Sequence, residues 1–466
     1  MILIKNVKII DGSGKPAFPG DVLISGEKIS AIGNLSNKKT ETVIEGLGNY
    51  LVPGFIDINS EIDHDLSIFT NPKQQDLTKQ GVTTAVGGHG GTSLAPLLYG
   101  SLKSIRKWTD INQVNVNWHD FQEFTQTIKK LPMGVNFCSL IGHSTIRRDI
   151  AGENSTDLTD PEISIFKATV EQALKDGAKG LSTGLNYLHG RQTPQKEIKE
   201  LVSIVAKYNA IYTTHLRNEK EGIVKSINEI YDTYKKTGAK TIINRFLPFL
   251  GFEKEFELGY EIVQRGGDGF FFAVSPTDIN IIPLYTLLPL WAQKGNLQEM
   301  TLIIKNPINE KKIIAELPKI KGDSMIMKAY EHNYLINKTI KNFAENRGIG
   351  QSKALLELMR VTSLRGLIAV KDINYELILK LIEDNKALIK PPFNDFLSVA
   401  NEKRWPLEKA IAKITSLPAQ ILNLKNRGMI RENYFADLVL LNNNEAQKVV
   451  INGESNFGHI LHDKTR

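Results

Sequence analysis

Short apolar runs separated by turn residues dominate the amino-terminal part of the chain. Apolar stretches at 2–10, 21–25 and 29–32 flank turns that contain glycine. Glycine turns between runs rich in isoleucine and valine predict antiparallel strands rather than helices. The first 54 residues are therefore predicted to be a small β-structure.

The middle of the chain alternates strand patterns with helix patterns. Thr159 is a predicted N-cap, Pro161 stands in the first helical turn, and Gly177 ends that helix before the apolar run 180–183. The series continues with a helix from Thr193 to about 209, a strand at 211–215, a helix at 221–236 and a strand at 241–245. A strand–helix–strand series of this kind predicts a parallel sheet, either open or closed into a barrel.

The later part of the chain departs from this alternation. Residues 285–350 are rich in lysine and asparagine, and they predict a helical insertion with no clean strand before 387–390. From 428 to 453 the pattern returns to turns and short strands. Because both ends of the chain are β-rich, we expect them to pair into one small β-sandwich beside the central unit.

The composition is that of an ordinary globular protein with a mild positive charge. The 466 residues include 58 Lys and Arg against 51 Asp and Glu, which gives a formal net charge of +7. No run of five or more basic residues is present, so nucleic acid is not an expected partner. The chain contains no apolar stretch of about 18 residues, so membrane insertion is not expected either.

The number of cysteines and the first residues of the chain indicate the cellular compartment in which the protein is expected. Lys5 and Lys8 interrupt the first apolar stretch, which predicts no signal peptide. Cys138, the one cysteine, excludes an internal disulfide and a multi-cysteine zinc site. It lies in the apolar run 135–140, which predicts a buried strand. These features favour a cytoplasmic protein.

Several short blocks along the chain form a recognisable series. In order they are Val52-Pro53-Gly54-Phe55-Ile56-Asp57, Gln80-Gly81-Val82-Thr83-Thr84, Ser93-Leu94-Ala95-Pro96, Gly142-His143, Gly180-Leu181-Ser182-Thr183-Gly184-Leu185 with Tyr187, Thr214-His215-Leu216-Arg217, Thr415-Ser416-Leu417-Pro418-Ala419 and Ala436-Asp437-Leu438-Val439. The series resembles metal-dependent amidohydrolases, and within them the N-acyl-D-amino-acid deacylase (D-aminoacylase) family.

The resemblance implies an α/β fold with a TIM-like (β/α)₈ barrel and a small β-sandwich formed from both termini. The barrel is expected at 55–425, with the insertion at about 285–350, and the sandwich at 1–54 together with 426–466. The implied reaction is hydrolysis of the C–N amide bond of an N-acyl-D-amino acid, with one or two zinc ions.

The residues at the implied metal positions differ from those of the family. The family has two histidines on the first strand, and the corresponding residues of this chain are Asn59 and Glu61. The cysteine of the family's Asn-Cys-Gly turn corresponds to Gly90. A later histidine corresponds to Arg245, and a metal-binding aspartate that also acts as general base corresponds to Pro392. An amide oxygen is a poor zinc donor, glycine has no donor, and arginine repels a cation. The usual dinuclear zinc catalysis is therefore not expected.

The remaining candidate metal ligands are His215, Glu61 and His89. Two cofactor states stay open: a single divalent ion, zinc by the resemblance, or no metal. The resemblance also implies three substrate-binding residues, His143, Tyr187 and Arg217.

Two further predictions concern charges at the barrel mouth. Asp57 is expected to cap its strand through backbone hydrogen bonds. Glu61 faces the barrel interior and needs a partner, and Arg245 is the predicted one, in an ion pair that fills the space left by the metals.

Three functions remain open on the sequence: a divergent hydrolase with one metal ion, a metal-free enzyme of another kind, and a catalytically silent binding or scaffold protein. The expected partner is a small-molecule substrate or ligand in the barrel mouth, and a closed mouth filled by side chains would favour the silent protein over a metal-free enzyme.

Overall fold

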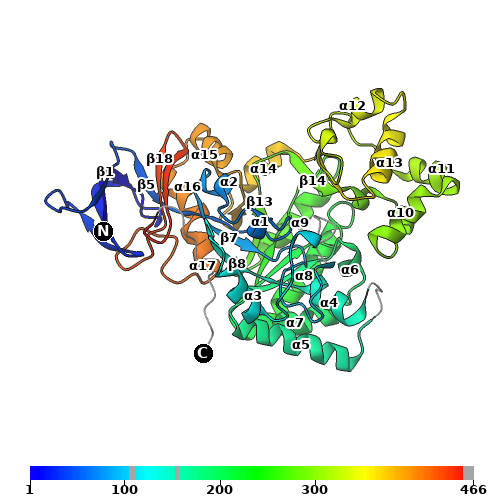
Figure 1. The fold of residues 1–466 in the computed structure, drawn as a ribbon, viewed down its shortest axis with the longest axis horizontal. Coiled ribbons are helices and arrows are strands. Elements are labelled where there is room, and N and C mark those ends of the chain that lie inside the picture. The colour runs from blue at the N-terminus through cyan, green and yellow to red at the C-terminus, as the bar shows by residue number, and fades with distance from the viewer. Residues whose placement is uncertain (104–110, 153–156, 455–466) are drawn as a thin grey trace.

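The computed structural model of the chain describes residues 1–103, 111–152 and 157–454. The final part of the predicted 426–466 segment, 455–466, lies outside the described residues. Figure 1 shows three parts: a sheet at one end, a central unit of strands and helices, and a lobe with α10–α13 at the other end. Within the described ranges, no helix is long and apolar enough to cross a membrane.

The central unit contains eight strand positions in chain order. They are β6 (Phe55–Asp57), β7 (Val82–Gly87), β8 (Asn136–Ser139) with β9 (Ile141–Gly142), β10 (Gly180–Gly184), β11 (Ile211–His215), β12 (Lys240–Ile243), β13 (Phe270–Val274) and β17 (Ala387–Ile389). Only Leu140 separates β8 from β9. Every neighbouring pair in the orders β6-β7-β8 and β9-β10-β11-β12-β13-β17 is parallel. All these strands therefore end on the same side of the unit.

The predicted strand–helix series of the middle region is confirmed. The helices are α5 (Asp160–Lys175), α7 (Gln195–Lys207), α8 (Ile223–Thr237) and α9 (Glu253–Arg265). Thr159 and Glu162 form a capping box at the start of α5, and Pro161 lies in its first turn. Cys138 is buried in β8, as its apolar surroundings predict.

Both ends of the chain contribute strands to one seven-stranded sheet. Its strands are β1 (Ile2–Ile9), β2 (Phe18–Ser25), β3 (Lys28–Gly33), β4 (Thr42–Glu45), β5 (Tyr50–Pro53), β18 (Leu438–Asn442) and β19 (Glu445–Val450). The antiparallel pair β5–β18 joins the two ends, with Val52 opposite Val439. β1, β5 and β18 lie together in Figure 1.

The inserted lobe contains strands that the sequence analysis did not expect. β14 (Ile279–Pro283), β16 (Gly366–Lys371) and β15 (Met325–Ala329) form an antiparallel sheet in that order. Helices α10 (Leu297–Lys305), α11 (Pro307–Glu316), α12 (Ile340–Glu345) and α13 (Gln351–Val361) pack on it around a separate apolar core. The expectation of no strand before 387–390 is wrong, because these short strands lie far apart in the sequence and pair across the helices between them.

A buried ion pair connects the terminal sheet to the central unit. Arg427 donates to Asp437, and both side chains are less than 5% exposed. The Asp437 carboxylate also accepts from Asn136 Nδ2 at the start of β8 (3.1 Å) and from the backbone N–H of Asn452 (3.0 Å). One carboxylate therefore holds three separate segments of the chain.

Replacing Arg427 by Met is expected to lower the free energy of unfolding by about 3–5 kcal/mol, because Asp437 would stay buried without its counter-charge. Urea denaturation measures the change. Arg431→Met removes the same charge from an exposed position nearby and should shift the free energy by no more than about 0.5 kcal/mol. Equal effects of the two changes would contradict this role for Arg427.

Candidate active site at the strand ends

Polar side chains gather where the parallel strands end. Asp57 ends β6, His215 ends β11, and Lys390 directly follows β17. His89 follows β7 by two residues, and Asn244 directly follows β12. Active sites of parallel barrels lie at this carboxyl edge, so we refer to the group as the mouth.

The first-strand residues form their own local pairs. The Asp57 carboxylate accepts from the backbone N–H of Asn59 at 3.0 Å, which confirms the predicted cap, and burial raises its pKa to about 6. Glu61 Oε2 lies 2.7 Å from His64 Nδ1. Burial alone would lower the pKa of His64, but the charges of Asp63 and Glu61 outweigh it and raise that pKa to about 9. His64 is therefore a cation at neutral pH.

Arg245 pairs with a different acid from the one expected. Its Nε donates to both carboxylate oxygens of Glu219, at 2.9 and 3.0 Å, and its Nη2 donates to Asn280 Oδ1 at 2.7 Å. The predicted Arg245–Glu61 ion pair is wrong. Glu219 lies in the loop after β11, beside the end of β12 that carries Arg245, whereas His64 holds Glu61.

Asn244 occupies the centre of the mouth and was not recognised in the sequence. Its Nδ2 donates to Asn59 Oδ1 at 2.6 Å and to His89 Nδ1 at 3.2 Å, while its backbone oxygen lies 3.5 Å from Lys390 Nζ. His89 is 2% exposed, and burial lowers its pKa to about 3, so its imidazole is neutral.

Lys390 is the second site residue that the sequence analysis missed. Burial and then the charge of Arg245 lower its pKa to about 8. The side chain is half-buried, and Asp57 and Glu61 are near enough to oppose that shift electrostatically. Pro392, taken as the replaced aspartate position, instead precedes helix α15 (Phe393–Glu402). Its position in the sequence could have identified Lys390 as a site residue, because it is the first polar residue after the apolar strand β17.

The space beside Gly90 is filled by two rings. A Cβ at position 90 would lie 3.3 Å from His215 Cε1 and 3.5 Å from Tyr187 Cε2. The rings of Tyr187 and His215 are 5.5 Å apart. In the described part of the chain, no three His, Cys, Asp or Glu side chains form a group able to hold a metal ion. His215, Glu61 and His89 therefore do not gather into one such group.

His143 makes its contacts behind the strands. Its Nε2 lies 2.7 Å from Glu197 Oε1 on α7, and its ring packs 5.2 Å from that of Phe166 on α5. Arg147 also donates to Glu197, at 3.1 Å. These contacts place His143 against the helices that cover the sheet.

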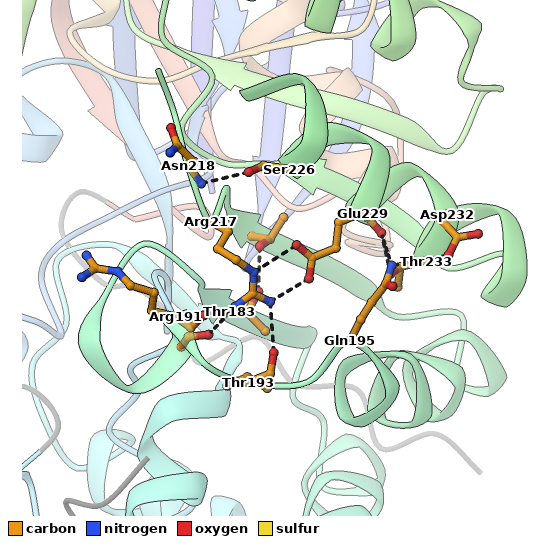
Figure 2. Close-up of polar contacts among 12 residues, drawn as sticks. Thr183, Arg191, Thr193, Gln195, Arg217, Asn218, Ser226, Glu229, Asp232 and Thr233 are labelled. Carbon is orange, nitrogen blue, oxygen red and sulfur yellow. Dashed lines mark hydrogen bonds and ion pairs between the residues drawn. The ribbon is translucent and has the colours of Figure 1, made fainter. Parts of the chain in front are cut away.

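Arg217 is held in a network of polar contacts, shown in Figure 2. Its Nε and Nη2 donate to the two Glu229 oxygens at 3.1 and 2.7 Å. The other three N–H groups donate to the backbone oxygens of Gly190, Arg191 and Thr193. All five donors of the guanidinium are thereby used within the protein.

A cavity of about 680 Å³ lies between the mouth and the inserted lobe. Tyr187, Glu219 and Arg245 line it from the central unit, and Ile282, Leu288 and Val370 line it from the lobe. Six cationic side chains line it in total: Arg191, Lys220, Arg245, Lys319, Lys321 and Lys371. Three acids, Glu219, Glu316 and Asp372, oppose them.

Known proteins resemble this chain in sequence and in fold. D-aminoacylase of Alcaligenes xylosoxydans xylosoxydans is 30% identical over 246 residues, which cover 52% of this chain and 50% of that protein. N-acyl-D-aspartate deacylase of the same organism is 33% identical over 230 residues, covering 49% and 45%. The chain thus spans about half the length of the curated relatives it matches. No family model matches it.

Solved structures match over almost the whole chain. N-acyl-D-glutamate deacylase from Bordetella bronchiseptica, in complex with zinc and a phosphonate inhibitor, has a TM-score of 0.81 at 19% identity and covers 99% of both chains. A D-aminoacylase structure has a TM-score of 0.79 at 21% identity with the same coverage. The chain therefore has the fold of these deacylases, and the predicted fold class is confirmed. In sequence, about half of the chain resembles D-aminoacylases and related N-acyl-D-amino-acid deacylases.

The pairing of His64 predicts a pH dependence of stability. Its pKa is about 9 in the folded state against 6.5 ordinarily, so its contribution is complete below about pH 6.5 and is lost as the pH rises through 9. The stability advantage of the wild type over His64→Gln should fall by about 1–3 kcal/mol between pH 6 and pH 9.5. Urea denaturation at both values measures it, and an advantage that grows with pH would contradict the assignment.

The contacts of Arg217 predict a structural effect. Arg217→Met should lower the free energy of unfolding by about 2–3 kcal/mol, because Glu229 and three backbone oxygens lose their donors. Lys196→Met, at an exposed position of α7, is the matched control and should change it by less than about 0.5 kcal/mol. Unchanged stability with weakened ligand binding would instead support a substrate contact for Arg217.

Proposed function

We propose that the protein binds a carboxylate-bearing, acylated small molecule of the N-acyl amino acid class, in the cavity between the mouth and the lobe, without zinc-dependent hydrolysis. The observation that carries this proposal is the cavity itself, which combines apolar walls with an excess of cationic side chains. The relatives are named for action on N-acyl-D-aspartate and N-acyl-D-glutamate, which are molecules of this chemistry.

The apolar part of the cavity suits an acyl group. Its walls include Phe249, Leu250, Ile282, Leu287, Leu288 and Val370. A volume of about 680 Å³ is in the range of small-molecule sites, and burial of apolar ligand surface supplies most of the affinity in such sites.

The cationic part of the cavity suits a carboxylate. Arg245 lies where the cavity meets the mouth, and its contacts with Glu219 and Asn280 engage only Nε and Nη2. Nη1 is therefore available to a ligand. Lys319 and Lys321 are exposed, and they add positive charge at the opposite, lobe side.

The donor set in the mouth does not fit a zinc ion. His64, the nearest histidine to Glu61, is held as a cation by its acid partners, and a protonated ring has no lone pair for a metal. The Nδ1 of His89 is used by Asn244, and Gly90 offers no donor. Arg245 and Lys390 place positive charge at the ends of two strands, where it would repel a cation. This supports a binding role over the zinc hydrolysis of the family.

Isothermal titration calorimetry with N-acetyl-D-glutamate and a longer N-acyl-D-amino acid tests the proposal. Saturable binding that survives EDTA is expected, with metal content below about a tenth of an equivalent by elemental analysis. The longer acyl chain should bind more tightly, by about 0.8 kcal/mol for each buried CH₂. Stoichiometric zinc together with release of free D-amino acid would overturn the proposal and restore the family reaction.

Charge removal at the cavity provides a matched comparison. The double change Lys319→Met with Lys321→Met should weaken binding roughly five- to thirty-fold, which corresponds to about 0.5–1 kcal/mol for each exposed charge. Lys338→Met with Lys341→Met removes the same charge from the same lobe, away from the cavity, and should leave the dissociation constant within about two-fold. Equal weakening by both pairs would indicate a general charge effect rather than a site.

A further inference from the structure

The amine of Lys390 differs in its surroundings from the other lysines whose pKa is lowered. Lys240 donates to Asn423 Oδ1 at 3.1 Å, Lys386 donates to the backbone oxygen of Val263 at 3.0 Å, and Lys413 donates to that of Asp384 at 2.5 Å. Within the described ranges, the one contact of Lys390 Nζ is a long one, 3.5 Å, to the backbone oxygen of Asn244.

The position of Lys390 is that of a reacting group. It directly follows β17 at the carboxyl edge of the parallel strands, where the side chain is half-buried. Among residues 1–103, 111–152 and 157–454, no acid forms an ion pair with this amine; Glu61 is held by His64 and Glu219 by Arg245. An amine in this situation loses its proton more readily than an exposed lysine, and its pKa of about 8 is in keeping with that.

Two groups near Lys390 indicate which kind of ligand its amine could react with. Asp57, whose pKa is raised to about 6 by burial, is close enough to influence Lys390 electrostatically and can exchange protons near neutral pH. Arg245 directly follows Asn244, the residue that Lys390 contacts, and its Nη1 can hold a carboxylate. The mouth thus combines an amine, a proton-exchanging acid and a carboxylate-binding guanidinium.

We infer that Lys390 is a nucleophilic amine that forms an imine with a small 2-oxo acid, whose carboxylate is bound by Arg245. The neutral amine adds to the ketone carbon, so that a C–N bond forms and the carbonyl electrons move to oxygen. Proton transfer from nitrogen to this oxygen gives a carbinolamine. Loss of the second amine proton and of the hydroxyl group as water then leaves the C=N bond. No oxidant, reductant or metal is needed.

This inference goes beyond the proposed function and does not depend on it. Both proposals use Arg245 to bind a carboxylate, but imine formation also needs Lys390, whereas binding of an acylated ligand needs the apolar cavity. Failure of either experiment therefore leaves the other result interpretable.

The test is reductive trapping on the full chain. The protein is incubated with pyruvate and sodium cyanoborohydride near pH 8, and adducts are located by intact-mass and peptide mass spectrometry. One adduct per chain, on the peptide that carries Lys390, is expected. Lys390→Arg keeps a cation in place without a nucleophilic amine and should reduce trapping at least ten-fold. Lys413→Met, which changes the other lysine with a pKa of about 8, should trap like the wild type.

A measurement on the unmodified chain covers the case in which Lys390→Arg does not fold. Trace labelling with acetic anhydride at pH 8 compares lysines within one protein, and Lys390 should be acetylated at least ten-fold faster than Lys413, whose amine is already engaged. Adducts scattered over surface lysines, or equal labelling of Lys390 and Lys413, would overturn the inference. Trapping that persists in folded Lys390→Arg would overturn it as well.

Discussion

The ion pair between Arg245 and Glu219 is the interaction on which the form of the mouth depends. It joins the end of β12 to the loop after β11, and through Asn280 it reaches the first strand of the inserted lobe. Asn280 in turn donates to Asp372, just beyond β16, at 3.1 Å. Arg245 has this partner and Glu61 pairs with His64, so that no acid among the described residues forms an ion pair with Lys390. The pairing of Arg245 with Glu219 thus determines how the other charged side chains of the mouth are paired.

Much of the fold could be predicted from local sequence signals. The capping residues Thr159 and Glu162 and the apolar strand at 211–215 act within a few residues, so the pattern alone locates them. The strands of the inserted lobe could not be located in this way. β15 and β16 satisfy their backbone groups by pairing across about 40 residues of intervening chain, and the short apolar run 367–370 in β16 was not recognised as a strand.

The candidate site was predictable in position but not in its contacts. The strand ends at Asp57, His215 and Arg245 were located, because a polar residue after an apolar strand indicates the active edge of a barrel. The predicted partner of Arg245 was wrong. Glu219 comes close to Arg245 because of the path of the loop after β11, and no sequence motif specifies that path. Lys390 and Asn244 were missed because only the positions of the expected metal ligands were compared with the family. Neither residue corresponded to such a position.

A bound metal ion and fixed cationic side chains would give the strand ends different chemistry. A zinc ion brings two positive charges to its site, and these are balanced by neutral and anionic ligands around it. Arg245 and Lys390 are cations just beyond the ends of β12 and β17, which are separated by β13, and each requires its environment to balance it. Glu219 forms an ion pair with Arg245, whereas Glu61, Asp57 and Glu219 act on Lys390 only through their charge. The imbalance concentrates reactivity at a single amine, whereas the strands are held together by clusters of apolar side chains.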